Sequence, residues 1–560
     1  MKTVKKLIIP LLGLSVLAYL FRIDILLLAV GLKADSRWDI QPTQQITWER
    51  PEEKLIPQTE RPPNIVLIVA DDLGWNDVSF YGGGLAGGTV PTPNIDTIAQ
   101  QGVAFEQGYA ANATCAPSRA ALMTGRYPTR FGFEFTPVLP AMMDMIGVIR
   151  DSFDRPLLPP SIRNESVVQL PYEEMTVPLS ETLLPELLSS VGYRNLHIGK
   201  WHLGETEETM PHARGFDQSL YMASGLYGKE DDPDIISSTQ DFDAIDPFLW
   251  KSLRFASYFN TKGGSALNDV AFEPDRYLTD HYTHEAVKAI EANKDQPFFL
   301  YLAHWAPHTP LQASREDYEA LSHIELHRER VHAAMVRALD RGVGQVLQAL
   351  KDNGIDNNTL VIFTSDNGAP SYIGLPNVNA PLRGWKVTHF DGGIRVPFFA
   401  KWPGKIDPGM RYQEPVHHTD VFSTIAAAAG VALPTDRIID GVDILPFIKG
   451  DISGAPHQYL FWRSGAAQAV RWGAYKLNVS APLGGARREW LFDLQKDPGE
   501  RNDLLTDKPK IAGRLRAALA VHNAAQAEPL WDWHTTSSVN IDRDSGQPDQ
   551  PGDTFINWTN

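Results

Sequence analysis

Residues 64–72 read Asn-Ile-Val-Leu-Ile-Val-Ala-Asp-Asp. The aliphatic run at 65–70 has the length of one strand, and such a run is typical of a strand buried on both faces of a parallel sheet. It ends directly in two adjacent carboxylates, Asp71 and Asp72. Because ligands of open α/β sheets bind at the carboxyl ends of the strands, we expect both carboxylates at a binding edge.

Three later strand-like runs also end in polar residues. The runs and the polar residues after them are 193–198 with Lys200 and His202, 297–303 with His304 and His308, and 359–364 with Asp366 and Asn367. Helical patterns separate them, at residues 93–101, 180–192 with Ser180 as the N-cap, 330–350 and 420–429. Strands that alternate with helices predict an α/β fold whose four strand ends meet at one edge.

The acidic and amide residues at two of these strand ends predict a metal site. Asp71, Asp72, Asp366 and Asn367 offer only oxygen ligands, which favour a hard divalent cation such as Ca²⁺, or less readily Mg²⁺, over zinc. Either pair alone could equally cap the turn after its strand. Two such pairs at one edge favour the metal.

Cys115 is the only cysteine of the chain and lies in the segment Cys-Ala-Pro-Ser-Arg at 115–119. The helix-forming residues that follow, and Gly125 after them, predict a helix that begins near Cys115. A helix N-terminus attracts anions, and Arg119 adds a full positive charge one turn later. The alternative is a buried structural thiol.

Composition excludes some classes of partner. The chain has 560 residues, with 51 Lys and Arg against 68 Asp and Glu, and a formal charge of −17. An acidic surface disfavours non-specific binding to nucleic acid or anionic lipid. One cysteine allows no internal disulfide, so an exported form must fold without one.

The N-terminus predicts export. Lys2, Lys5 and Lys6 precede apolar runs at 7–21 and 25–32, so residues 1–33 fit a signal peptide or a signal anchor. We therefore expect a periplasmic, secreted or lumenal protein, with or without a membrane anchor at residues 1–33, and an amphipathic cytosolic helix is the alternative. Residues 34–62 are polar and rich in proline, which predicts a linker.

The rest of the chain divides into a catalytic domain at 63–445, a small α+β domain at 456–527 and a polar tail at 528–560 that wraps or stays loose. Within the large domain, residues 131–171 predict an insertion without regular structure, whose apolar residues form a satellite cluster rather than a cleft wall or a membrane-contact patch. Residues 205–290 predict loops around the mouth of the site. We expect surface or capping roles for the histidines outside the strand ends: His327, His332, His417 and His418.

Six motifs occur in an order that resembles the formylglycine-dependent sulfatases, and arylsulfatase B, an N-acetylgalactosamine-4-sulfatase, most closely. They are Ala-Asp-Asp-Leu-Gly-Trp-Asn-Asp at 70–77, Cys-Ala-Pro-Ser-Arg at 115–119, Gly-Lys-Trp-His-Leu-Gly at 199–204, Pro-His-Thr-Pro-Leu at 307–311, Ser-Asp-Asn-Gly at 365–368 and Leu-Arg-Gly-Trp-Lys at 382–386. The resemblance covers about residues 63–505. It implies a fold of the alkaline phosphatase type with a smaller C-terminal domain.

The resemblance also implies the cofactors. A maturation enzyme would oxidise Cys115 to formylglycine, whose hydrate is the nucleophile and a further ligand of Ca²⁺. The other Ca²⁺ ligands would be Asp71, Asp72, Asp366 and Asn367.

Further residues take roles from the same resemblance. Arg119 would orient the hydrate, while Lys200 and Lys386 would hold the sulfate. His308, with Lys386, would protonate the departing alcohol, and His202 would deprotonate the second hydroxyl so that sulfate is expelled.

The activity implied is hydrolysis of a sulfate ester, with a sulfated saccharide or an aryl sulfate as substrate. Two alternatives stay open. The first is a phosphodiesterase or phosphonate hydrolase of the same superfamily, and the second is a non-catalytic glycan-binding protein that uses Ca²⁺.

Overall fold

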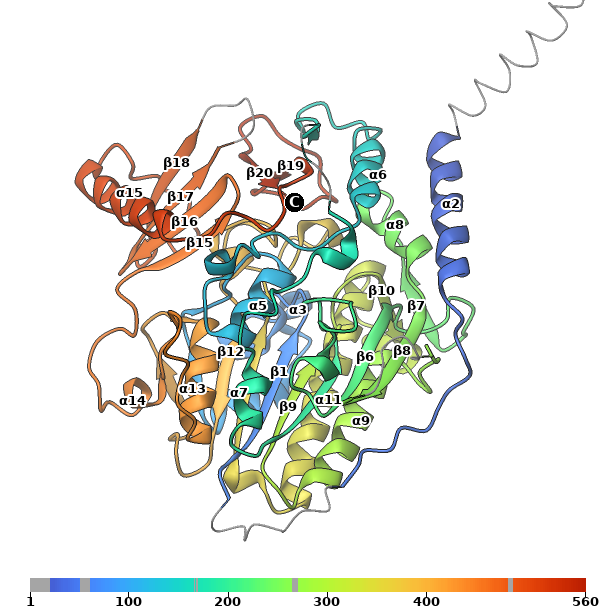
Figure 1. Ribbon diagram of the computed structural model, residues 1–560. Coiled ribbons are helices and arrows are strands. Elements are labelled where there is room, and N and C mark those ends of the chain that lie inside the picture. Colours follow the sequence, from blue (N-terminus) through green and yellow to red (C-terminus); the bar gives the residue numbers. More distant parts are fainter. Residues whose placement is uncertain are drawn as a thin grey trace, which may run out of the picture.

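The computed structural model describes residues 21–50, 61–165, 167, 170–263, 270–481 and 487–559. The expected apolar run at 7–21 lies almost wholly outside these residues. Figure 1 shows a large central sheet with helices on both faces and a second, smaller sheet beside it.

The central sheet is mixed, with parallel strands in its middle. In spatial order it contains β13 (Met410–Tyr412), β2 (Val103–Phe105), β12 (Phe398–Lys401), β11 (Thr359–Ser365), β1 (Asn64–Ala70), β9 (Phe298–Ala303), β5 (Arg194–Gly199), β6 (Gln218–Gly225) and β8 (Phe255–Thr261). The strands β11, β1, β9 and β5 are mutually parallel. These are the four strands predicted from the aliphatic runs, and their carboxyl ends lie at one edge.

Strand β1 is buried along its whole length, as its sequence predicts. Val66 and Ile68 belong to the apolar core on one face of the sheet, and Leu67 and Val69 belong to the core on the other face. The first core is closed by α4 (Pro93–Gln100), α9 (Leu278–Asn293) and α11 (His327–Asp352). The second is closed by α5 (Cys115–Thr124), α7 (Leu184–Ser189) and α13 (Thr419–Ala429). Two buried faces explain why β1 carries an unbroken aliphatic run.

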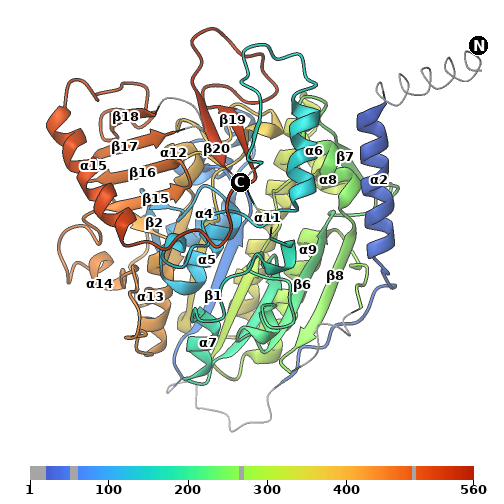
Figure 2. The ribbon, with the colours of Figure 1, turned by 45° about the horizontal axis from the view of Figure 1, so that its top comes forward.

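The C-terminal α+β unit forms as expected. A four-stranded antiparallel sheet contains β15 (Leu460–Ser464), β16 (Ala467–Trp472), β17 (Tyr475–Ser480) and β18 (Arg488–Asp493). The helix α15 (Pro509–Ala524) packs on it through Ala512, Leu515 and Leu519, and the unit lies beside the central sheet (Figure 2).

The end of the chain is more regular than its polar composition predicts. Strands β19 (Thr535–Asn540) and β20 (Phe555–Thr559) pair with each other, and β19 also pairs with the short β4 (Ile162–Arg163). Of the two expected forms, the structure shows the wrapped tail and not the loose one, because β19 pairs both with the neighbouring β20 and with β4 of the distant insertion.

Two segments that were expected to lack regular structure contain helices or strands. Residues 205–290 hold β6, β8 and α9, together with β7 (Ile235–Ser238) and α8 (Ile245–Ser252). The insertion at 131–171 contains α6 (Pro140–Arg150). Apolar residues of this insertion form the predicted satellite cluster, with Phe248 and Leu249 of α8 and residues of α2 (Arg22–Arg37). They also line a cavity together with Cys115, so the expectation that they form no cleft wall was wrong.

The segment predicted as a linker is partly packed. After α2, Ile46 and Trp48 are buried in the main core, and the Trp48 indole Nε1 donates to Glu285 Oε2 at 2.8 Å. Residues 38–50 are therefore not a free tether. Within the described residues, we find no helix with the length and apolar character to cross a bilayer.

Several smaller predictions were wrong. The helix expected from Ser180 begins only at Leu184, with Leu183 as its N-cap. His332, expected in solvent, is buried 3.3 Å from Asp77. His418 is also buried, with Ser118 Oγ at 2.9 Å and Thr364 Oγ1 at 3.1 Å from its ring nitrogens.

Lys476 joins the C-terminal sheet to the catalytic domain. Its buried Nζ lies 2.7 Å from Asp391 Oδ1 and 3.0 Å from Glu500 Oε1, and all three side chains are fully buried. Burial raises the pKa of Asp391, but the charge of Lys476 acts against burial, and the pKa is lowered. We predict that Lys476→Met lowers the free energy of unfolding by about 3–5 kcal/mol at pH 7, because it removes the close cation of two buried carboxylates and leaves Asp391, among the described residues, with only Arg395 at 3.7 Å.

Calorimetric or chemical unfolding of the two proteins tests this prediction. The control is Lys496→Met, because Lys496 is 79% exposed and its ion pair with Asp493 spans 3.7 Å. That exposed pair should contribute about 0–1 kcal/mol. Equal effects of the two substitutions would contradict the role given to Lys476.

Candidate active site

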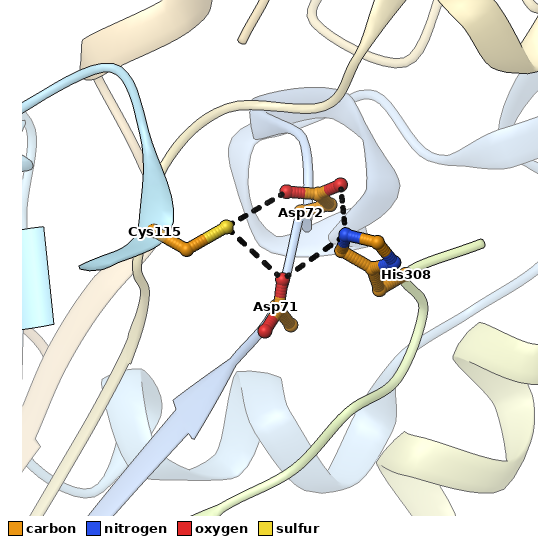
Figure 3. A group of neighbouring side chains, drawn as sticks. All are labelled: Asp71, Asp72, Cys115 and His308. Atoms are coloured by element: carbon orange, nitrogen blue, oxygen red, sulfur yellow. Dashed lines mark hydrogen bonds and ion pairs between the residues drawn. The ribbon is translucent and has the colours of Figure 1, made fainter. Parts of the chain in front are cut away.

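The ends of the parallel strands and the first turn of α5 meet at one point. Asp71 and Asp72 follow β1, His308 follows β9, and Cys115 begins α5. Figure 3 shows these four side chains pointing toward one another. Their ligand atoms lie within 4.8 Å of one another, and all four residues are buried. The strand ends therefore converge as the sequence predicts.

Cys115 is the first residue of its helix, so its side chain lies where backbone N–H groups are unpaired. Its Sγ lies 3.6 Å from Asp71 Oδ1 and 3.9 Å from Asp72 Oδ1. Burial, and then the nearby Asp366 and Asp71 carboxylates, raise the pKa of the thiol. At neutral pH the unmodified thiol is therefore protonated and is a poor nucleophile.

Arg119, one turn further along α5, is fully buried and connects two of the strand ends. Its Nη2 donates to Asp71 Oδ2 at 2.9 Å and its Nε donates to Asp366 Oδ2 at 2.8 Å. The Tyr301 hydroxyl lies 3.2 Å from Nη1. The guanidinium group thus fixes the position of α5 relative to β1 and β11.

Two lysines bring further positive charge to the carboxylates. Lys200 Nζ lies 2.7 Å from Asp71 Oδ2, and Lys386 Nζ lies 2.7 Å from Asp72 Oδ1. Although burial opposes it, the Asp72 carboxylate raises the pKa of Lys386 well above its usual value. Both residues also line one cavity with Cys115, so their ammonium groups can reach a bound anion.

His308 has one nitrogen in a backbone contact and the other in the site. Its Nδ1 lies 2.6 Å from the carbonyl oxygen of Thr309, which can only accept, so Nδ1 carries a proton. Its Nε2 lies 3.3 Å from Lys386 Nζ and 3.5 Å from Asp72 Oδ2. Burial and the charge of Lys386 lower the pKa of the imidazole. The neutral His308 therefore accepts a hydrogen bond at Nε2 from the charged Lys386.

His202 also lines the cavity, but not through the extended backbone that the sequence suggested. Strand β5 ends at Gly199, and His202 has φ +66°, a left-handed conformation. Burial and the charge of Lys200 lower the pKa of His202 well below its usual value. Its Nδ1 has no hydrogen-bond partner among the described residues. The side chain is therefore a neutral imidazole with one nitrogen available.

The predicted metal ligands lie close together, but their side chains have different hydrogen-bond partners. Asp366 Oδ1 accepts from the backbone N–H of Asp72 at 3.2 Å, and the Asn367 amide donates to Asp72 Oδ1 at 2.7 Å. Burial and the charge of Asp71 raise the pKa of Asp366 to about 6. Asn367 Oδ1 is buried and finds no partner among the described residues.

These ligand atoms fit a hard divalent cation. Three carboxylates and an orphaned amide oxygen supply oxygen donors, and the cation would satisfy the amide oxygen. The compact cluster of ligand atoms contains Asp71, Asp72, Cys115 and His308. Asp366 accepts from the Asp72 backbone and from Arg119, and the Asn367 amide donates to Asp72.

Three aromatic residues of the site were missed in the sequence. Trp305 stacks on His308 with ring centroids 3.8 Å apart, and Lys200 Nζ lies 4.7 Å from the Trp305 ring centroid. The Tyr372 hydroxyl donates to Asp72 Oδ2 at 3.3 Å, and the Tyr301 hydroxyl reaches Arg119. Trp305 stands only three residues before His308, which was a usable signal. Tyr372 lies in a short turn after β11 that carries no pattern.

Comparison with known families identifies most of the chain. The family described as "Sulfatase" matches residues 63–431, and the family described as "N-sulphoglucosamine sulphohydrolase, C-terminal" matches residues 385–522.

Individual relatives agree. N-acetylgalactosamine-6-sulfatase from Mus musculus is 36% identical over 480 residues, which cover 79% of this chain and 82% of the relative. Steryl-sulfatase from Mus musculus is 31% identical over 550 residues, covering 83% and 82%. A crystal structure described as Ps i-CgsB in complex with k-i-k-neocarrahexaose is 32% identical with a TM-score of 0.66, covering 84% of this chain and 95% of that one.

These neighbours and the mixed central sheet flanked by helices confirm the expected α/β fold of the alkaline phosphatase type. They do not confirm the particular resemblance to arylsulfatase B, which stays a prediction.

Proposed function

Because this chain belongs to the sulfatase family, and is a sulfuric ester hydrolase, we propose that it hydrolyses sulfate esters with formylglycine at residue 115 as the nucleophile and Ca²⁺ as the metal cofactor. The observation that carries the proposal is the position of Cys115 at a helix N-terminus, within 4 Å of two carboxylates that carry lysine partners. The raised pKa of the thiol supports a modified residue as the nucleophile, because the thiol itself is protonated. The required maturation enzyme belongs to the same proposal.

The two cofactors supply what the side chains lack: formylglycine provides a hydrated aldehyde nucleophile, and the cation provides positive charge beside the sulfate. Asp71, Asp72, Asp366 and Asn367 would hold the cation, with residue 115 as a further ligand. Arg119 holds Asp71 and Asp366 in place through its two short hydrogen bonds.

The remaining polar residues act on the substrate and its protons. Lys200 and Lys386 attract the sulfate and orient it over residue 115. Lys386 Nζ donates a hydrogen bond to His308 Nε2 at 3.3 Å, and this pair would deliver a proton to the departing alcohol oxygen. His202, neutral and with a free nitrogen, accepts a proton from residue 115 in the second half of the reaction.

The names of the relatives support two kinds of substrate. One mouse relative is named N-acetylgalactosamine-6-sulfatase, after a sugar, and the other is named steryl-sulfatase. The proposed substrate is a sulfated saccharide or an aryl sulfate. Export, with or without an N-terminal membrane anchor, is part of the proposal and rests on the pattern of residues 1–33.

Substitution of Cys115 tests the nucleophile. We predict that Cys115→Ser accepts one sulfo group from an aryl sulfate and then stops, because a serine ester has no second hydroxyl on the same carbon to expel sulfate. Intact-protein mass spectrometry would show the mass of one added sulfo group and no turnover. Cys115→Ala is the control and should neither turn over nor gain mass. Multiple turnover by Cys115→Ser would contradict the scheme.

The wild-type protein distinguishes the proposed function from its two alternatives. The peptide that contains residue 115 should show the aldehyde in enzyme from a host with the maturation system. The same enzyme should hydrolyse 4-nitrophenyl sulfate faster than an aryl phosphodiester. An intact thiol in fully active enzyme, or a preference for the phosphodiester, would overturn the proposal.

His308 is predicted to matter most when the leaving group is basic. His308→Gln should lower kcat by about 10²–10⁴-fold for an alkyl sulfate, because the departing alkoxide needs a proton in the transition state. The loss for 4-nitrophenyl sulfate should be much smaller, since nitrophenolate leaves without one. His323→Gln, at an exposed histidine, is the control. Equal losses for both substrates would contradict the role of His308 as a proton donor.

The metal site predicts a thermal shift that does not depend on activity. Ca²⁺ at 100 times its Kd should stabilise the protein by about 2.7 kcal/mol, because it binds only the folded state. Asp72→Asn should remove most of this shift, whereas Asp407→Asn, at an exposed acid, should retain it. Calorimetry with Ca²⁺ and with Mg²⁺ would rank the two ions. An equal shift in both variants would contradict the assignment.

A further inference from the structure

We propose that the sulfate ester carries a bulky apolar alcohol, and that this group binds in an apolar vestibule beside Cys115. The vestibule is formed by Met142, Met143 and Ile146 of α6, Phe248 and Leu249 of α8, and Val30 of α2. The inference rests on the proposed function, because it assigns the alcohol part of the same substrate. It concerns the apolar group itself, whether a fused-ring system or a long chain.

The vestibule and the catalytic residues line one continuous cavity of about 500 Å³. Cys115, Lys200 and His308 line this cavity together with the vestibule residues. A cavity of this size holds a ligand of drug-like dimensions. A sulfate held by the two lysines therefore has its alcohol group within the same enclosure.

Three helices that are distant in the sequence build this wall. Figures 1 and 2 show α2, α6 and α8 beside one another at the same edge of the molecule. Their apolar residues form a cluster separate from the two main cores. Three methionines of α6 face the cavity, at positions 142, 143 and 145. Methionine adapts its shape readily, which suits a surface that receives an apolar ligand.

Several polar residues of the cavity wall away from the catalytic residues already have partners. Glu205 lies 3.0 Å from the Tyr172 hydroxyl and 3.5 Å from Arg37 Nη2. The Ser224 hydroxyl accepts from the backbone N–H of Arg254, and the Ser252 hydroxyl donates to the carbonyl oxygen of Leu249. A saccharide placed against α6 and α8 would bury hydroxyl groups without hydrogen bonds, which is unfavourable. An apolar group gains from the same burial.

A competition assay tests the proposal with the full-length enzyme that carries formylglycine and retains α2. Each sulfate ester competes with 4-nitrophenyl sulfate, so the inhibition constant reports binding and is independent of the leaving group. The competitors are a sterol sulfate, decyl sulfate at micromolar concentration, and N-acetylgalactosamine 6-sulfate. We expect at least one apolar ester to bind about tenfold or more tightly than the saccharide ester. The sterol and decyl esters distinguish a ring-shaped from a chain-shaped ligand.

Substitutions on α6 locate the binding. Met142→Gln retains the side-chain length but adds an amide, and Ile146→Asn makes a larger change at a buried position. Both should weaken binding of the preferred apolar ester about tenfold, whereas the control variant should bind it as the wild-type enzyme does. The control is Val148→Asn, because Val148 is on the same helix, is 42% exposed and does not line the cavity. If Ile146→Asn does not fold, Met142→Gln still decides the question.

Two results would overturn the inference. One is equal or tighter binding of the saccharide ester. The other is an equal effect of Met142→Gln and Val148→Asn. Failure of the proposed function is distinct, because it would abolish hydrolysis of 4-nitrophenyl sulfate itself. Binding of the same three esters by calorimetry would then still test the vestibule.

Discussion

The structure depends on keeping three carboxylates together without water. Asp71, Asp72 and Asp366 are buried at the ends of adjacent strands, where burial disfavours their charged forms. Arg119, Lys200 and Lys386 place three cations against them at hydrogen-bonding distance. The pKa values of the carboxyl groups move in different directions. Burial raises the pKa of Asp71, but the charges of Lys200 and Arg119 outweigh burial and lower it. Burial and the charge of Asp71 raise the pKa of Asp366.

This balance of charge explains why the catalytic groups come from different elements. A single helix or strand cannot present three acids and three cations to one point, but parallel strands bring their carboxyl ends to one edge. Strands β1 and β11 supply the acids, and the segments after β5 and β9 supply Lys200 and His308. The guanidinium of Arg119 then holds helix α5, and with it Cys115, against that edge.

Sequence alone predicted these strands and the C-terminal α+β unit well, and the segments at 131–171, 205–290 and 528–560 poorly, for a physical reason. A strand buried on both faces is largely apolar, so β1, β9 and β11 are visible as apolar runs. Strand β6 contains an irregularity between Met222 and Ser224, and β19 reads Thr-Thr-Ser-Ser-Val-Asn. Such strands are defined by the strands with which they pair and not by an apolar run. Likewise, the motifs disclosed the charged residues of the site, whereas the turn that presents Tyr372 to Asp72 carries no pattern.

The same contrast separates the chemistry of the site from its specificity. The reacting end of the cavity lies on strand ends and α5, whose backbone is fixed by the sheet and by Arg119. The opposite wall is built by α2, α6 and α8, which contact one another in a satellite cluster outside the two main cores. Those helices can change in shape and polarity with little effect on the carboxylates, because few of their residues take part in the packing of the sheet. A preference for the alcohol part of the substrate can therefore be set by three peripheral helices while the hydrolysis itself stays with the buried charges.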